Sequence, residues 1–235
     1  MNTFSIIDAY KVGWSKFKNN WKYVIISGLI ISLVTSGADM YMYIKNWSFQ
    51  VEQGPIYALA NFVLSLVGVF LGYNLIKGIL RASDNHPVSI KNLFEKTSHT
   101  LRDCWRYILI QLITGAMSFV FVLPIAIHLA DSDNFYAPDL ASYLLVAFAI
   151  IGGLYVYTLF GFSILSMIDK QKGVIASLKH SYKICHPHAF KLAAFYVMSV
   201  IAMAVGFALL FIPGIILAGV FCFATVAVYR KISDN

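Results

Sequence analysis

The chain has 235 residues, of which 59% are hydrophobic and only 12% are charged, and its mean hydropathy is +0.72. Soluble domains carry about 25% charged residues, so this composition excludes an ordinary soluble domain and indicates an integral membrane protein. The formal net charge is +7, and its meaning depends on where the basic residues lie.

Six apolar runs reach or approach the length that a membrane span requires. A helix needs about 20 residues to cross about 30 Å of hydrocarbon. In chain order, the predicted spans are residues 23–43, 56–80, 105–129, 140–168, 192–211 and 214–229. Their central portions contain no Asp, Glu, Lys or Arg. We therefore predict an all-α polytopic protein with six transmembrane helices, which forms a single integral membrane domain over residues 1–235.

The distribution of Lys and Arg predicts the orientation. All but Lys45 of the 18 basic residues lie near the two ends of the chain or in the second and fourth loops between the predicted spans. Cationic loops stay in the cytoplasm, so we expect the N- and C-termini there. Because the basic charge then belongs to one membrane face, we expect no nucleic-acid site.

Three segments of the chain begin alike. Aromatic-plus-cation pairs recur 84 and 85 residues apart, at Trp21-Lys22, Trp105-Arg106 and Phe190-Lys191. Similarity at a fixed period indicates repeated structural units. We predict three units, at about residues 1–83, 84–168 and 169–235, each with an amphipathic surface helix and a transmembrane hairpin.

The predicted surface helices carry apolar residues at steps of three and four. In the first these are Phe4, Ile7, Tyr10, Trp14, Phe17 and Trp21; in the second Ile90, Phe94, Thr97, Leu101 and Cys104; in the third Ile175, Leu178, Tyr182 and Cys185. Such a pattern shows that one face is buried, either in the membrane interface or against the spans. Pro187 is expected to end the third helix, and Ile212-Pro213-Gly214 to form a tight reversal between the last two spans.

Basic residues on these helices are the candidate binding site. We expect them to engage anionic lipid headgroups on the cytoplasmic face, or a partner protein or second copy of the chain. The candidates are Lys11, Lys16, Lys18, Lys91, Lys96, Arg102, Lys179 and Lys183.

An alternative function is a transporter or channel for a small or lipid-like solute. Asn61, Asn74 and Gln111 are polar residues within predicted spans, and such residues mark pathways or join helices by hydrogen bonds. A proton-coupled mechanism has little support, because no carboxylate lies in mid-span.

Enzymatic chemistry has no motif in the sequence. The chain has no P-loop, no Gly-x-Ser-x-Gly and no His-Glu-x-x-His. His180, Cys185, His186 and His188 resemble a metal site, but no second cluster completes a tetrahedron. We expect no enzyme, no cofactor and no metal.

Two stretches, GWSKFKNN at residues 13–20 and FIPGIIL at residues 211–217, carry a family resemblance. With the repeat, they make nearly the whole chain similar to a family of six-span bacterial inner-membrane proteins like YciC. That family resembles the membrane domain beside some glycerophosphodiester phosphodiesterases. The resemblance implies a bacterial inner (cytoplasmic) membrane location. It implies no hydrolase activity and supplies no catalytic residues, because the phosphodiesterase domain is absent.

Overall fold

The structure is a computed structural model and describes residues 4–46, 55–96, 99–131, 140–209 and 211–233. It does not describe the side chains of residues 37–46, 55–57, 129–131 and 211. Within the described ranges the chain is helical and contains no strand, which confirms the predicted all-α class. The elements are α1 (Ile6–Asn46), α2 (Pro55–Ser83), η1 (Ile90–Phe94), α3 (Thr100–Asp131), α4 (Leu140–Phe160), α5 (Ser163–Lys170), α6 (Val174–Cys185), η2 (His186–His188), α7 (Ala189–Leu209) and α8 (Phe211–Ser233).

Five helical stretches of the described chain are long and apolar enough to cross a membrane. They are Ala58–Ser83, Thr100–His128, Leu140–Lys170, Val174–Leu209 and Ile212–Ser233. This set is compatible with a multi-pass membrane protein. The first predicted span, at residues 23–43, is not among the five. It lies inside α1, and the side chains of its last residues are outside the described part of the chain.

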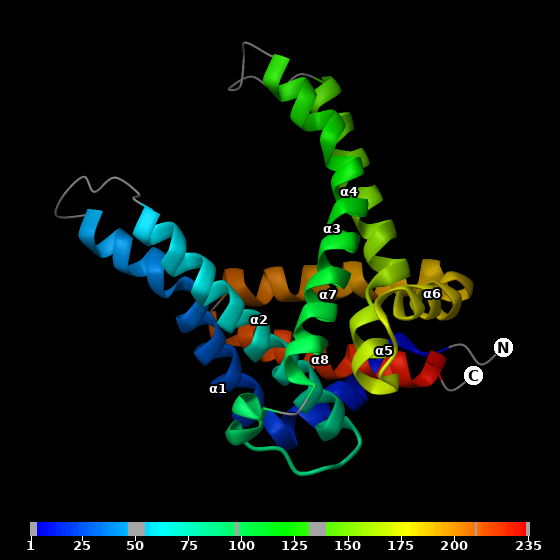
Figure 1. Cartoon of the computed structure of the whole chain (residues 1–235). Helices are drawn as coiled ribbons and strands as arrows, with labels where there is room; N and C mark the ends of the chain where they lie inside the picture. Colours follow the sequence, from blue (N-terminus) through cyan, green and yellow to red (C-terminus); the bar gives the residue numbers. More distant parts are fainter. Residues whose placement is uncertain (1–3, 47–54, 97–98, 132–139, 210, 234–235) are drawn as a thin grey trace. The chain divides into compact units, whose positions relative to one another are not determined.

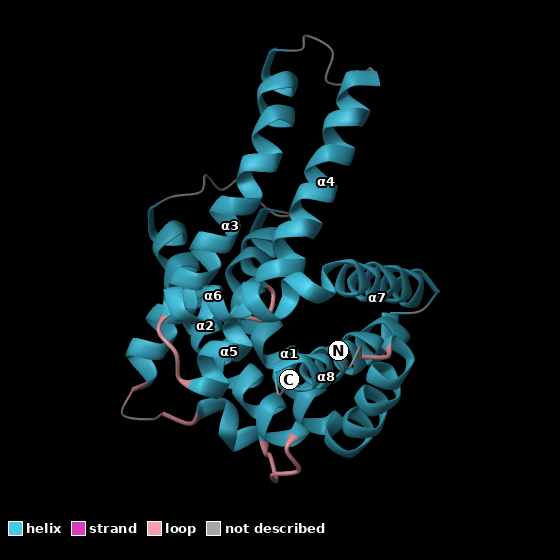
Figure 2. Ribbon diagram, turned by 90° about the vertical axis from the view of Figure 1, so that its right-hand side faces the viewer, coloured by secondary structure: helices cyan, strands magenta, loops and turns pink. Residues whose placement is uncertain are grey.

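The chain divides into two compact units. The terminal unit comprises Phe4–Cys104 with Ala202–Lys231, and the central unit is built on Trp105–Ile201 and includes Ile232 and Ser233. In the terminal unit α1 and α2 pair as a hairpin, drawn blue to cyan in Figure 1. In the central unit α3 and α4 lie side by side in both views (Figures 1 and 2), and the rings of Phe121 and Phe148 stand 5.5 Å apart between them.

A kink at Asn20 divides α1 into the predicted surface helix and the first part of the predicted span. The backbone of Asn20 is not helical (φ −125°, ψ 15°), and its side-chain amide donates to the carbonyl of Lys16 at 2.9 Å. The amide therefore satisfies a backbone acceptor at the kink, where helical hydrogen bonding is disturbed.

The surface part of α1 packs closely on α8. A Cβ placed on Gly13 would lie 2.7 Å from the carbonyl oxygen of Val220 and 2.9 Å from the backbone nitrogen of Ala224. On the other side of the contact, a Cβ on Gly219 would overlap the ring of Phe17. Glycine on both helices thus lets the two backbones approach.

The prediction of a second surface helix over residues 90–104 is wrong. Only η1 forms, Glu95 is extended (φ −67°, ψ 116°), and α3 begins at Thr100, while Thr97 lies outside the described residues. The amide of Asn74 donates to the carbonyls of Leu93 (3.0 Å) and Glu95 (3.3 Å). These hydrogen bonds tie the end of η1 to α2 and satisfy two backbone acceptors at the point where the helix ends.

The fourth predicted span, residues 140–168, is interrupted rather than continuous. Its helix ends at Phe160, a turn follows at Gly161 and Phe162, and α5 begins at Ser163. The hydroxyl of Ser181 in α6 donates to the carbonyl of Leu159 at 2.8 Å, beside the break. A side chain from another helix thus binds a carbonyl in the last turn of α4.

Two prolines behave differently from each other. The third surface helix, α6, ends at Cys185, and Pro187 lies in η2, as predicted. The predicted reversal at residues 212–214 is wrong, because α8 already begins at Phe211. Pro213 sits in the first turn of that helix, where a missing backbone N–H costs no hydrogen bond.

Candidate functional site

An exposed stripe of apolar and basic residues runs along the surface part of α1. Ile7, Lys11, Trp14 and Lys18 follow one another at steps of four, three and four, which places them on one face of the helix, and Trp21 follows just beyond the kink at Asn20. Ile7 is 66% exposed, Trp14 53% and Trp21 45%, and both lysines are exposed. We call this set the α1 stripe.

The contact with α8 explains why this face is exposed. Ala9, Gly13 and Phe17 lie on the opposite side of α1 and are buried. The predicted apolar set of this helix is therefore split in the structure. Phe4 and Phe17 pack inside the protein, whereas Ile7, Trp14 and Trp21 remain on the surface.

A shorter stripe of the same composition lies on α6. Ile175 (66% exposed), Lys179 and Tyr182 (44% exposed) form the α6 stripe, which lies opposite a buried face of Ser177, Ser181 and Cys185. These positions match α1 after 168 residues. The exposed positions 7, 11 and 14 of α1 correspond to the exposed positions 175, 179 and 182 of α6. The buried positions 9, 13 and 17 correspond to the buried positions 177, 181 and 185.

Lys16 has a different role from the lysines of the α1 stripe. Its ammonium group donates to the carbonyl of Ser83 at 2.7 Å and to Oδ1 of Asn85 at 2.6 Å, so it joins α1 to the end of α2. Asn85 takes a left-handed conformation (φ 63°), which asparagine tolerates better than most residues. The adjacent Asp84 pairs with Arg230 of α8 at 2.7 Å.

The eight predicted basic residues are divided between the two units. Lys91 and Lys96 are exposed at η1, and Arg102 is exposed with its Nε 3.6 Å from the carboxylate of Asp103. The terminal unit contains Lys11, Lys16, Lys18, Lys91, Lys96 and Arg102, and the central unit contains Lys179 and Lys183.

A polar network holds η1 against α2. Arg81 binds Glu95 through two hydrogen bonds (Nη1–Oε2 2.7 Å, Nη2–Oε1 3.4 Å), and the amide of Asn92 donates to Oε2 at 3.1 Å. The hydrogen bond from Arg81, followed by that from Asn92, lowers the pKa of Glu95 below its ordinary value. Sequence reasoning missed this network, because Arg81 and Glu95 belong to different predicted elements.

The three polar residues of the transport alternative lie in different surroundings. Asn74 is 2% exposed, and its amide is occupied by the two carbonyls that end η1. Asn61 is half-buried on the same helix, α2. Gln111 is exposed on α3 in the central unit, and its Nε2 donates to the hydroxyl of Tyr107 at 3.4 Å. Asn61 and Asn74 thus belong to the terminal unit and Gln111 to the central unit.

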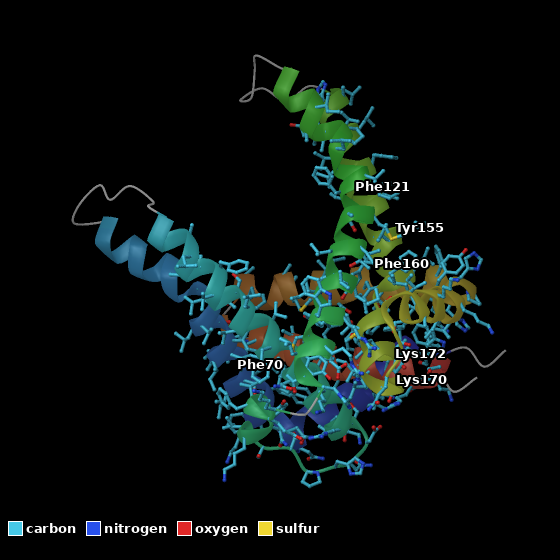
Figure 3. The ribbon with its side chains drawn as sticks, viewed as in Figure 1. Phe70, Phe121, Tyr155, Phe160, Lys170 and Lys172 are labelled. Atoms are coloured by element: carbon cyan, nitrogen blue, oxygen red, sulfur yellow. The ribbon has the colours of Figure 1, made fainter. Side chains whose placement is uncertain are left out.

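Two lysines flank the turn between α5 and α6 (Figure 3, where Lys170 and Lys172 are labelled). Lys170 ends α5, Gln171 reverses the chain in the left-handed region (φ 48°), and Lys172 precedes the first turn of α6. Lys183 and His180 of α6 lie within electrostatic range of this turn. The sequence analysis named Lys183 as a candidate but not Lys170 or Lys172, although the two lysines flank a single residue in the sequence.

Buried hydroxyl groups accompany the break in the fourth span. Thr158, Ser163, Ser166 and Ser177 are almost completely buried, and their hydroxyl oxygens have no hydrogen-bond partner among the described residues. They come from α4, α5 and α6, and α6 contacts both of the other helices. Small hydroxyl side chains allow close packing of helices in a membrane.

Within the described residues, no group of three or more His, Cys, Asp or Glu side chains is placed to hold a metal ion. Comparison of the chain with family models, curated proteins and solved structures finds no match.

Proposed function

We propose that this chain is a non-enzymatic inner-membrane protein that binds the anionic lipid surface of the cytoplasmic face through the α1 and α6 stripes. The observation that carries the proposal is the exposure of Trp14 and Trp21 between the exposed lysines of α1. Exposed tryptophans beside ammonium groups have the composition of a membrane-interface helix.

The energetics favour an anionic surface. Each lysine near such a surface contributes about 1 kcal/mol, and the attraction falls within a Debye length. Trp14 and Trp21 suit the headgroup level of a membrane, because an indole ring is apolar except for its N–H group, which can hydrogen-bond to water or headgroups. Lys22 lies over the ring of Trp21 at 5.8 Å, which keeps a third charge at the stripe.

The proposal includes six spans, with both termini in the cytoplasm, and three structural repeats. The orientation is supported by the concentration of Lys and Arg at the ends of the chain and in the second and fourth loops. The bacterial location and membership of the YciC-like family are proposed from the resemblance at residues 13–20 and 211–217.

The repeat is supported by how the surface segments pack. Each one contacts the returning helix of the repeat before it: η1 contacts α2, and α6 contacts α4. The surface part of α1 belongs to the first repeat and packs on α8, the returning helix of the third repeat, through Gly13. It therefore fits the same pattern if the three repeats are taken in cyclic order. The matching of α1 and α6 after 168 residues adds independent support.

Transport has weaker support in this arrangement. The amide of Asn74, the most deeply buried of its three candidate residues, is occupied by two backbone carbonyls. This hydrogen bonding supports a structural role for Asn74.

Brominated lipids test the proposal directly. A variant in which Trp21, Trp47 and Trp105 are replaced by Phe keeps Trp14 as its one tryptophan, which can be excited selectively at the red edge of the absorption band. In nanodiscs we expect brominated phosphatidylglycerol to quench Trp14 more strongly than brominated phosphatidylcholine. The Lys11→Gln/Lys18→Gln change should remove about 2 kcal/mol of attraction, or roughly a thirtyfold preference.

The matched control is Lys11→Arg/Lys18→Arg, which preserves both charges and should preserve the preference for the anionic lipid. The proposal that the stripes bind an anionic surface would be refuted if both lipids quenched Trp14 equally and the Lys11→Gln/Lys18→Gln change had no effect. Absence of quenching by either lipid would show that protein covers the α1 stripe, and would assign this face to a partner or a second copy.

A further inference from the structure

We propose that polar side chains at the break in the fourth predicted span form a buried site that binds water. They come from α4, α5 and α6 and lie inside the central unit, so the proposal does not rest on lipid binding by the stripes. The atoms of this polar cluster are the hydroxyl oxygens of Thr158, Ser163, Ser166 and Ser177 and Nε2 of His180.

The polar cluster is buried and has no hydrogen-bond partner in the part of the chain that the structure describes. Thr158 is 2% exposed, and the three serines are 0% exposed. His180 is half-buried, but its Nε2 is inaccessible and also has no partner among the described residues. A buried polar atom left unsatisfied costs free energy, so native proteins pair such atoms with protein groups or ordered water.

A turn and a hydrogen bond hold α5 alongside the first eight residues of α6. At one end, Gln171 reverses the chain between the two helices. At the other end, the hydroxyl of Ser181 donates at 2.8 Å to the carbonyl of Leu159, four residues before α5 begins. Residues 163–170 and 174–181 have equal lengths and span about 10 Å each. Two such helices held at both ends run side by side, in agreement with the contacts between α5 and α6.

This arrangement brings the polar cluster together. Ser163 and Ser166 lie three residues apart on α5, so they occupy one side of that helix about one turn apart. Ser177 and His180 have the same spacing on α6. Ser166 and Ser177 lie at matching distances from the turn, and Ser163 and His180 do so one turn further away. Thr158 completes the cluster, because it lies in the last turn of α4, next to the carbonyl that α6 binds.

Water suits these atoms better than a metal ion does. A hydroxyl donates and accepts, a neutral imidazole nitrogen does one or the other, and a water molecule can satisfy both kinds of group. One water bridges atoms up to about 5.5 Å apart, which is beyond the reach of a direct hydrogen bond. The cluster contains no carboxylate to balance a cation. Ordered water also satisfies polar groups where a membrane helix is broken.

Water-edited solid-state NMR tests the site in the full-length protein. Protein labelled with ¹³C-serine and ¹³C-threonine is reconstituted in liposomes, and magnetisation is transferred from water to the side chains. We expect the Cβ signals of Ser166 and Ser177 to build up several-fold faster than that of Ser199. Ser199 is the matched control, because it is 1% exposed and its hydroxyl donates to the carbonyl of Phe195 at 2.6 Å. Ser166→Ala and Ser177→Ala assign the two signals by their loss.

Thr158→Val distinguishes a hydrated hydroxyl from a dry one, because valine has nearly the same shape as threonine. Loss of a hydroxyl that binds water should lower the midpoint of denaturation, whereas loss of a dry, unsatisfied hydroxyl would raise it. The variant should also slow the build-up at Ser163. Thr225→Val is the matched control, since that hydroxyl donates to the carbonyl of Phe221 in its own helix at 2.8 Å. It should leave the build-up at Ser163 unchanged.

Three results would overturn the proposal. The first is build-up at Ser166 and Ser177 as slow as at Ser199, and the second is a higher denaturation midpoint for Thr158→Val. The third is loss of the fast build-up when choline replaces Na⁺ and K⁺, which would assign the site to a cation. Lys11→Gln/Lys18→Gln should leave the build-up unchanged, so failure of the stripe proposal and failure of this one are distinguishable.

Discussion

Single residues determine which face of α1 is buried and which is exposed. A hydrogen atom is all that fits at Gly13, because the nearest atoms of α8 include the backbone of Val220 and Ala224, which cannot move like the end of a flexible side chain. This close approach buries one face of the helix and leaves Trp14 and Lys18 exposed. The orientation of the α1 stripe therefore depends on a residue that is not part of it.

Gly13→Ala should separate the surface part of α1 from α8. We expect a loss of about 1–3 kcal/mol in the free energy of unfolding, the usual cost of overpacking, measured by denaturant titration in mixed micelles. Gly28→Ala is the matched control in the same helix, since a Cβ there meets nothing within 4 Å. That change should be neutral or slightly stabilising, because alanine favours a helix over glycine. Equal destabilisation by both would contradict the packing described.

Residue type alone did not reveal the role of Asn74. An amide within a span is equally typical of a solute pathway and of a structural hydrogen bond. Its true partners, the carbonyls of Leu93 and Glu95, lie about 20 residues further along the chain. No local pattern predicts a contact between a side chain and a distant backbone carbonyl, so only the folded structure distinguishes the two roles.

At the scale of elements, sequence periodicity predicted long helices well and their interruptions poorly. Apolar length alone located the helices that became α2, α3, α7 and α8, and Pro187 correctly marked the end of α6. The short η1 and the break at Gly161 were missed. Beside each of them a side chain from another helix, Asn74 or Ser181, donates to a backbone carbonyl. The periodicity of one segment contains no information about hydrogen bonds that side chains of another segment make to it.

The attachment of η1 to α2 should weaken in acid. The pKa of Glu95 is lowered in the folded protein, so its ion pair with Arg81 stabilises the folded state above about pH 4.5, the ordinary value for glutamate. That contribution is lost as the pH falls through the lowered pKa. Hydrogen–deuterium exchange of peptides covering residues 90–95 should therefore show stable protection near neutral pH and declining protection below about 4.5.

Glu95→Gln provides the control for this acid effect. The variant cannot ionise, so its protection should be lower at neutral pH and should change less on acidification. The two proteins share all their other carboxylates, so the effect of those groups cancels in the comparison. A decline of the same size in Glu95→Gln would assign the acid sensitivity to other carboxylates.

For the whole molecule, the number of spans determines where the two ends lie. An even number places both ends on one face, whereas an odd number places them on opposite faces. Basic residues cluster near both ends of the chain, at Lys11, Lys16 and Lys18 and at Arg230 and Lys231. This distribution favours an even number and a cytoplasmic face for both ends.

Reporter fusions check this topology. A green fluorescent protein fused at either end should fluoresce in cells, and alkaline phosphatase inserted between residues 132 and 139 should be active, because that loop is predicted to lie outside the cytoplasm. Fluorescence at one end only would support five spans, and would mean that α1 does not cross the membrane. Residues 132–139 contain Asp133 and Asp139 but no Lys or Arg, which agrees with the predicted side.

The pairing of each surface segment with an earlier repeat also sets an order of assembly during synthesis. When η1 and α6 leave the ribosome, their partner helices α2 and α4 have already been made, so each docks as it emerges. The surface part of α1 is the exception: it emerges before all other described helices, and its partner α8 emerges after them. The face around Gly13 therefore lacks its partner until α8 has been made. A chain that stops before α8 leaves the face around Gly13 without its partner helix.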